Sequence, residues 1–137
     1  MITGLDHIAV AVPDLEKAIA RFMADFGLHY DGSEEVENAK TATAFFPLKS
    51  TSIELVSPLR GEGPIAKYLE KKPGGLHHLC FSTDDIVADV ARLTALGYQF
   101  LADAPSPGAH GCQVIFIHPK SCDGVLIELS QPGDEHH

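Results

Sequence analysis

The chain has no tryptophan, only two methionines and only three cysteines in 137 residues. Cys80, Cys112 and Cys122 lack CxxC spacing, so the sequence predicts neither a zinc ribbon nor a dithiol redox site, and we expect reduced thiols. No apolar run approaches the roughly 20 residues of a transmembrane helix. The first residues, MITGLDH, carry neither the basic and apolar regions of a secretion signal nor an Arg-rich transit pattern. We therefore expect a soluble, cytoplasmic protein.

Basic residues are also scarce, with 10 Lys and Arg against 19 Asp and Glu and a net charge of −9. This balance argues against nucleic acid or an anionic membrane as a partner, because both need a basic protein face. A small anionic substrate is compatible with it if positive charge is concentrated locally. With 45% hydrophobic residues, the chain has the composition of a globular protein, long enough for one domain or two small fused halves.

The sequence repeats itself once. The segment from His7, HIAVAVPDLEKAIARF, aligns without gaps to the segment from His78, HLCFSTDDIVADVARL, at an offset of 71 (78 − 7). Few letters are identical, but hydrophobic positions coincide, as in Ile8 and Leu79. Each copy predicts a strand and then an amphipathic helix, because apolar residues recur every three or four positions after an aspartate that suits a helix N-cap.

Each half continues with three more strands, so both are predicted to be βαβββ modules, at about 4–57 and 76–131, followed by a tail at 132–137. The linker 58–75 is expected to hold a short helix from Pro64 to Lys72, since Pro suits a first helical position. The Pro- and Gly-rich loop Ala104–Gly111 is expected to lack regular structure and to line a site. The further strands are expected at Leu28–Tyr30, Thr41–Phe46 and Ser52–Ser57, then at Tyr98–Leu101, Gln113–His118 and Gly124–Ser130.

Strand alternation indicates which histidines share a face with other polar or small residues. His7 alternates with large aliphatic residues and lies on the same face as Ala9 and Ala11. In the second copy, His78 falls on the small, polar face, whereas His77 shares a face with apolar residues. The alternation therefore selects His78, and we expect His77 to pack behind the site.

Two glutamates interrupt strongly apolar strands near the end of each module. Glu54 follows His7 by 47 residues (54 − 7) and Glu128 follows His78 by 50 (128 − 78). A lone buried carboxylate costs several kcal/mol unless a cation or a hydrogen-bond network offsets it.

A single histidine or glutamate in a strand is usually structural, but two of each at equivalent repeat positions predict a metal site. The predicted ligands are His7, His78, Glu54 and Glu128. Mixed imidazole and carboxylate ligation suits Zn, Co, Mn, Ni or Fe and disfavours Ca or Mg. His29 and His118 have no such support and are expected at the surface.

These motifs resemble those of the vicinal oxygen chelate superfamily and, within it, the methylmalonyl-CoA epimerase family. The resemblance covers nearly the whole chain. LDHIAVAVPDLEKA and IELVSPL are shared by many members of the superfamily, whereas GPIAKYLEKKPGGLHHLCF and GAHG with IFIHPKSCDGVLIEL point to the epimerases. It implies an α+β fold in a single domain over 1–137, with paired βαβββ modules forming a cupped, eight-stranded mixed sheet around a divalent metal.

The resemblance also implies roles for the predicted site residues. His7, His78 and Glu128 match metal ligands of the family, and Glu54 falls where the family has a Gln or Glu ligand. Co²⁺ or Mn²⁺ is then the favoured ion, with Zn²⁺ and Ni²⁺ as alternatives. The implied reaction interconverts (2R)- and (2S)-methylmalonyl-CoA through an enolate. Glu54 and Glu128 are the candidate catalytic bases, because their equivalent positions in the two modules suit an approach to the α-carbon from opposite sides. One departure is the third strand, Lys40–Phe45, which lacks the carboxylate that some epimerases carry there.

The expected partners are an acyl-CoA substrate and a second copy of the chain in a homodimer. Four lysines are candidates for contacting CoA phosphates, although solvated surface positions are the simpler explanation: Lys67, Lys71, Lys72 and Lys120. His110 is either a substrate contact or a solvent-exposed residue. The main alternative function is a glyoxalase I-like lyase, which shares the ligand layout and enolate chemistry. An Fe(II) dioxygenase and a metal-free antibiotic-binding protein are further alternatives.

Overall fold

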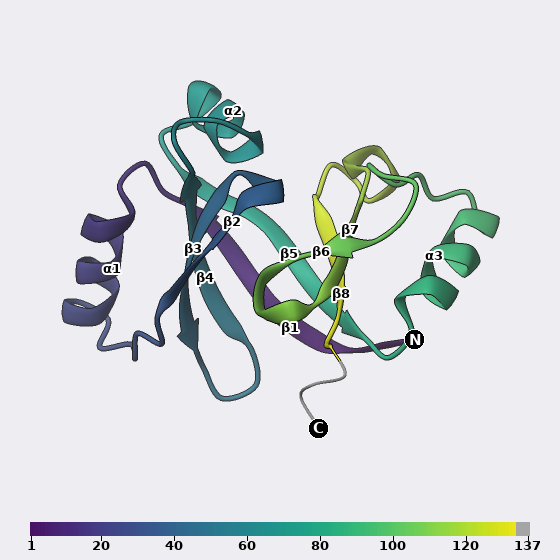
Figure 1. Cartoon of the computed structure of the whole chain (residues 1–137), viewed down its shortest axis with the longest axis horizontal. Helices are drawn as coiled ribbons and strands as arrows, with labels where there is room; N and C mark the ends of the chain where they lie inside the picture. Colours follow the sequence, from purple (N-terminus) through teal and green to yellow (C-terminus); the bar gives the residue numbers. More distant parts are fainter. Residues whose placement is uncertain (134–137) are drawn as a thin grey trace. The chain divides into compact units, whose positions relative to one another are not determined.

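The computed structural model of the chain describes residues 1–133, so the end of the predicted tail, 134–137, lies outside the described residues. The fold divides into two compact units (Figure 1). One comprises His7–His77, and the other comprises Met1–Asp6 together with the chain from His78 onward. Strands β1 (Ile2–Ala11) and β5 (Gly75–Thr83) therefore each begin in one unit and end in the other.

The unit His7–His77 contains four strands in the order β2-β3-β4-β1. β4 runs parallel to β1 and antiparallel to β3, which is itself antiparallel to β2. Helix α1 starts after Asp14, whose side chain accepts a hydrogen bond from the Lys17 N–H (3.2 Å) and so caps the first turn. The elements are α1 (Leu15–Ala24), β2 (Ser33–Val36), β3 (Thr41–Pro47), β4 (Ser52–Pro58) and α2 (Pro64–Lys71).

The two faces of this unit bury different side chains. Large apolar residues on one face, including Phe46 and Leu55, pack with α1. On the other face, Ala9, Ala11 and Val56 pack against Ile65 and other apolar residues of α2. The alternation predicted for β1 is thus confirmed, and the small residues of this face are buried because α2 covers them.

The other unit has the same plan, with strands in the order β5-β8-β7-β6. β8 is parallel to β5 and antiparallel to β7, and Asp85 caps helix α3 by accepting from the Ala88 N–H (3.1 Å). Its apolar core is built from Ile86, Ile115 and Leu129 with neighbouring side chains. The elements are α3 (Ile86–Ala95), β6 (Ser106–Pro107), β7 (Gln113–Ile117) and β8 (Ile127–Gln131).

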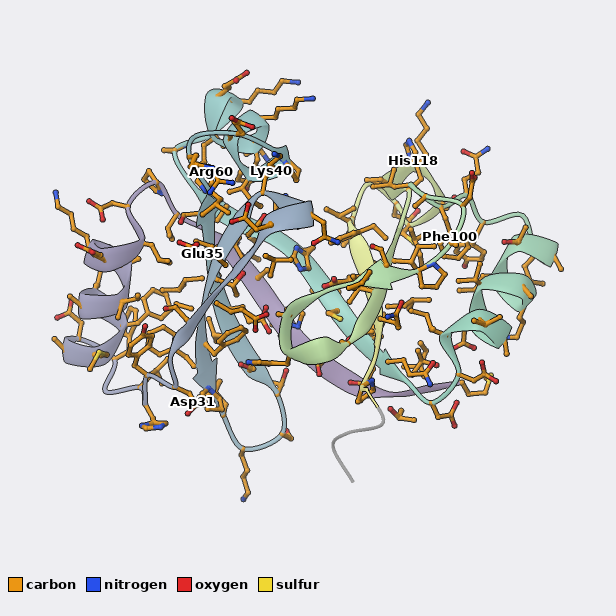
Figure 2. The ribbon with its side chains drawn as sticks, in the orientation of Figure 1. Asp31, Glu35, Lys40, Arg60, Phe100 and His118 are labelled. Atoms are coloured by element: carbon orange, nitrogen blue, oxygen red, sulfur yellow. The ribbon has the colours of Figure 1, made fainter. Side chains whose placement is uncertain are left out.

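The predicted α+β plan of two βαβββ modules is confirmed, but two predicted strands are wrong. Leu28–Tyr30 and Tyr98–Leu101 are not strands; apart from one isolated bridge at Phe100 (Figure 2), the edge strands come later in the chain, at β2 and β6. Leu28 and Tyr30 instead pack in the core beside α1, and Tyr98 and Phe100 pack in the core beside α3. The loop Ala104–Gly111 also contains more regular structure than expected, namely β6 and a 3-10 turn.

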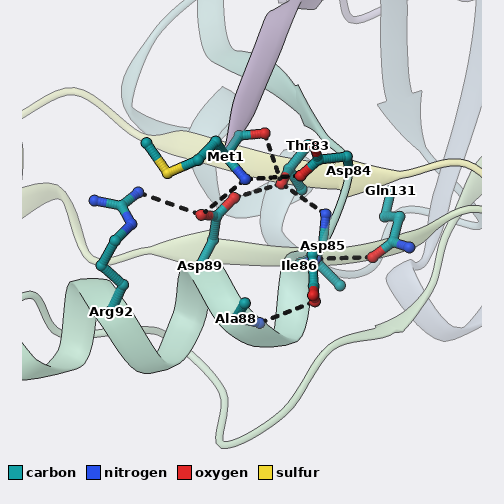
Figure 3. Close-up of polar contacts among 9 residues, drawn as sticks. All are labelled: Met1, Thr83, Asp84, Asp85, Ile86, Ala88, Asp89, Arg92 and Gln131. Atoms are coloured by element: carbon teal, nitrogen blue, oxygen red, sulfur yellow. Dashed lines mark hydrogen bonds and ion pairs between the residues drawn. The ribbon is translucent and has the colours of Figure 1, made fainter.

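A buried polar pair distinguishes the second module from the first. Thr83 donates a hydrogen bond to Asp89 of α3, and both side chains are fully buried (Figure 3). The repeat offset of 71 places Val12 and Ala18 at the equivalent positions of the first module, where both belong to the apolar core. No helix in residues 1–133 is long and apolar enough to span a membrane.

Candidate metal site

The first half of the predicted site lies on two parallel strands of the unit His7–His77. Ala9 of β1 is registered with Glu54 of β4, and His7, two residues earlier, points to the same face as Ala9. His7 Nδ1 lies 3.2 Å from Glu54 Oε2, and the two side chains are only 8% and 13% exposed. An imidazole and a carboxylate are therefore held in contact away from bulk water.

The second half has the same construction in the other unit. Cys80 of β5 is registered with Glu128 of the parallel strand β8, and His78 lies two residues before Cys80. His78 Nε2 is 3.1 Å from Glu128 Oε1, with side-chain exposures of 8% and 10%. The structure thus brings each predicted histidine to the glutamate of its own module, at the same strand register.

The imidazoles differ in the nitrogen that they present. His7 offers Nδ1 to its glutamate, whereas His78 offers Nε2. The neighbouring His77 lies against Tyr68 instead, with ring centroids 5.2 Å apart in an edge-to-face arrangement. His77 is therefore a packing residue, in agreement with the prediction from strand alternation.

The donors of each half fit a divalent metal ion. Imidazole nitrogen and carboxylate oxygen bind such ions at about 2.0–2.2 Å, so two ligands of one ion lie roughly 3.0–3.4 Å apart. The nitrogen–oxygen distances of 3.2 Å and 3.1 Å fall in this range. A bound cation would also offset the cost of burying each carboxylate.

Sequence reasoning missed an aromatic residue that accompanies each glutamate. Phe45 of β3 is registered with Glu54, and Phe116 of β7 is registered with Glu128. The signal was present in the sequence, because Phe45 and Phe116 are separated by 71 residues (116 − 45), the same offset as the two histidines. Both positions lie in stretches that are predicted only as apolar strands.

His29, His110 and His118, none of them a predicted ligand, lie in loops or 3-10 turns. His29 is exposed and faces Asp31, with 3.8 Å between Nε2 and Oδ1, as expected for a surface residue. His118 is partly exposed, and its Nδ1 accepts from the Lys120 N–H at 3.1 Å, capping a 3-10 turn, Pro119–Ser121 (Figure 2). His110 is exposed in the 3-10 turn Ala109–Gly111 with a positive φ of 59°.

Comparison with known proteins identifies the class to which this fold and these half-sites belong. A family model of the glyoxalase/bleomycin resistance protein/dioxygenase superfamily matches residues 6–116, so the chain belongs to this superfamily. The ethylmalonyl-CoA/methylmalonyl-CoA epimerase of Cereibacter sphaeroides is 42% identical over 133 residues, which cover 96% of this chain and 99% of the relative. Within the superfamily, the chain therefore belongs to the methylmalonyl-CoA epimerases, which are isomerases.

Solved structures agree with this assignment. The crystal structure of methylmalonyl-CoA epimerase from Mycobacterium tuberculosis matches with a TM-score of 0.93 at 32% identity, covering 98% of this chain and 91% of that one. A methylmalonyl-CoA epimerase in complex with methylmalonyl-CoA and NH4+ matches with a TM-score of 0.93 at 31% identity, covering 98% and 97%. The α+β glyoxalase-type fold is thus confirmed, and the epimerase is favoured over the glyoxalase I-like lyase.

Proposed function

We propose that this chain interconverts (2R)- and (2S)-methylmalonyl-CoA by removing the α-proton on one face and returning a proton on the other. The observation that carries the proposal is the pair of buried His–Glu contacts at equivalent strand registers. The family relationship supplies the substrate class, since the relatives are named for epimerising acyl-CoA thioesters.

We further propose that His7, His78, Glu54 and Glu128 hold one divalent ion between them. The donor chemistry supports Co²⁺ or Mn²⁺, which the family resemblance favours, with Zn²⁺ and Ni²⁺ as alternatives. When bound, such an ion would withdraw negative charge from the thioester oxygen and make the α-proton more acidic. In this proposal the modules 4–57 and 76–131 and their linker 58–75 act as a single domain.

The glutamates are the proposed bases. Inversion requires proton transfer on both faces of the α-carbon, and Glu54 and Glu128 come from different modules, which suits action on opposite faces. In this proposal a glutamate loosens from the ion when it acts. One carboxylate takes the α-proton, the electrons of the C–H bond pass into the enolate, and the carboxylic acid of the other glutamate returns a proton to the same carbon. β3 contributes Phe45 rather than a carboxylate beside Glu54, so the proposal takes both bases from β4 and β8.

Three further proposals concern partners and surroundings. Four lysines are proposed to neutralise CoA phosphates: Lys67 and Lys71 of α2, Lys72 just after it, and Lys120. A homodimer is proposed because cupped sheets leave edges to cover. A reducing compartment such as the cytoplasm is proposed because Cys80, Cys112 and Cys122 lack the spacing of a paired disulfide framework.

The proposed function is tested by following α-deuterium uptake from D₂O into each enantiomer separately. We expect Glu54→Gln and Glu128→Gln each to slow epimerisation by about 10²–10⁴-fold, the contribution of a positioned general base. If each glutamate serves one face, each variant loses exchange mainly with one enantiomer. Glu70→Gln, on the exposed side of α2, is the matched control and is expected to retain wild-type rates.

The contrary result is equally specific. Unaltered exchange with both enantiomers in both variants would remove the glutamates from the reaction. Absence of methylmalonyl-CoA turnover by wild-type protein supplied with Co²⁺ or Mn²⁺ would refute the proposed substrate.

A further inference from the structure

The aromatic residues beside the two glutamates occupy the same position in both modules. In the first module, Ala9 of β1, Glu54 of β4 and Phe45 of β3 are in register across three neighbouring strands. In the second module, Cys80, Glu128 and Phe116 are in register in the same way. Directly opposed residues in a sheet project to the same face, so each phenyl ring shares the face of its glutamate. The repeat has thus kept a histidine, a glutamate and a phenylalanine in one arrangement.

In the second module the phenyl ring also contacts the histidine. The centroids of Phe116 and His78 are 5.1 Å apart and the ring planes meet at 90°. This is the edge-to-face geometry that aromatic pairs prefer, and such pairs are stabilising beyond their burial. Phe116 therefore favours one orientation of the imidazole over others.

Ring orientation matters here because the χ2 angle of histidine, about the Cβ–Cγ bond, has a broad distribution and is only weakly restricted by the side chain itself. His78 Nε2 lies 3.1 Å from Glu128 Oε1, and a rotation about the Cβ–Cγ bond would exchange the ring edge that faces the carboxylate. Strand pairing holds the glutamate through its register with Cys80 and Phe116. The edge-to-face contact with Phe116 restricts the rotation of the His78 imidazole.

We infer that Phe116 is a positioning residue for metal binding, which orients the His78 imidazole so that the nitrogen facing Glu128 is presented to the ion. The inference rests on the proposed function in one respect, that His78 and Glu128 bind a divalent metal. Residues that orient metal-bound histidines change metal affinity by about 10–100-fold when they are replaced. Phe116 does so through ring contact rather than through a hydrogen bond.

The test compares Phe116→Leu with Phe81→Leu. Both substitutions replace a phenyl ring by an aliphatic side chain in the same unit, but Phe81 packs in the apolar core beside α3, on the face of β5 opposite to His78. Co²⁺ affinity is measured by titration against a competing chelator. The visible absorption of bound Co²⁺ is recorded as a second signal, which reports ligand geometry without any turnover.

For Phe116→Leu we expect Co²⁺ binding to weaken by about 10–100-fold, with a changed visible spectrum. Phe81→Leu is expected to lower the thermal unfolding temperature while leaving Co²⁺ affinity within about twofold of wild type. Phe116→Tyr retains the ring edge and is expected to restore both affinity and spectrum, which separates ring contact from folding defects.

Wild-type affinity and spectrum in Phe116→Leu would overturn the inference, as would equal losses in Phe116→Leu and Phe81→Leu. Failure of wild-type protein to bind Co²⁺ is a distinct result, because it overturns the metal proposal before any variant is compared. Failure of Phe116→Tyr to recover affinity would also count against ring contact as the cause.

Discussion

Thr83→Val and Asp89→Ala replace the buried polar pair of the second module by the residue types found at the equivalent positions of the first. The two substitutions test how much this polar pair contributes to the free energy of unfolding. Both side chains are 1% exposed, and the Thr83 hydroxyl donates to Asp89 Oδ2 (Figure 3). Asp89 Oδ1 faces Arg92 Nη2 at 3.3 Å and the ammonium of Met1 at 3.4 Å. The equivalent residues of the first module, Val12 and Ala18, form an apolar contact region instead.

The expected energies follow from the contacts of each group. Asp89→Ala removes a buried carboxylate faced by two cations and a hydroxyl, so the free energy of unfolding should fall by about 3 kcal/mol. Thr83→Val removes a hydrogen bond to a buried charge and should cost about 2 kcal/mol. The double variant recreates the apolar pair of the first module. It should cost about 3 kcal/mol rather than the sum of about 5, a coupling of roughly 2 kcal/mol between contacting residues.

Urea unfolding of the wild type, both single variants and the double variant gives the coupling energy directly. Asp84→Asn is the control, since Asp84 meets the same ammonium at 2.7 Å but is 67% exposed, and an exposed pair contributes at most about 1 kcal/mol. Additive losses in the double variant would refute the reasoning. A loss below about 0.5 kcal/mol in Asp89→Ala would refute it as well, because the carboxylate would then contribute nothing to the fold.

Three other predictions follow from the same structure. Burial acts to raise the pKa of Asp89, but the Thr83 hydroxyl and the neighbouring cations outweigh it, so the pKa lies below the ordinary value of 3.8. A depressed folded-state pKa stabilises the protein above about pH 4, and this stabilisation is lost as the pH falls through the folded-state pKa. The free energy of unfolding of the wild type should therefore fall more steeply than that of the double variant between about pH 4 and about pH 2. Parallel curves of unfolding free energy against pH would contradict this. Gly63→Ala should destabilise by about 1–3 kcal/mol in urea, because φ is 95° and the new Cβ would lie 2.6 Å from Lys40 Cβ. Gly61→Ala, with φ of 70° and open space around it, should cost less, and equal losses would show that the contact is irrelevant. Removing bound metal with a chelator should lower the unfolding temperature, and adding Co²⁺ or Mn²⁺, but not Ca²⁺, should restore it. An unfolding temperature that does not change with the chelator would contradict the proposed metal site.

The two half-sites were predictable because strand alternation and the internal repeat are local properties of the chain. Alternation selected His78 over His77, and the structure places His78 against Glu128 and His77 against Tyr68. The repeat related Glu54 to Glu128 although neither lies near its histidine in sequence. Both inferences needed only the period of two along a strand and the offset of 71.

The wrong predictions have a common cause. Leu28–Tyr30 and Tyr98–Leu101 have the apolar residues of short strands, but Leu28 and Tyr30 pack into the core beside α1, and Tyr98 and Phe100 pack into the core beside α3. Burial beside a helix and burial in a sheet select the same residue types over so short a stretch, so composition did not distinguish them. The edge strands β2 and β6 are polar or short, and pairing with a neighbouring strand defines them.

The sequence by itself determined the two βαβββ modules, the face on which each histidine lies and the glutamate that accompanies it. Tertiary structure decided the registers, which pair Ala9 with Glu54 and Cys80 with Glu128. It also decided that His7 offers Nδ1 and His78 offers Nε2 to the carboxylates, and that a phenyl ring meets the second imidazole. The physical reason is the separation along the chain of the residues that set each property. Alternation follows from backbone geometry at each residue, whereas register and ring orientation depend on strands far apart in the chain packing against one another.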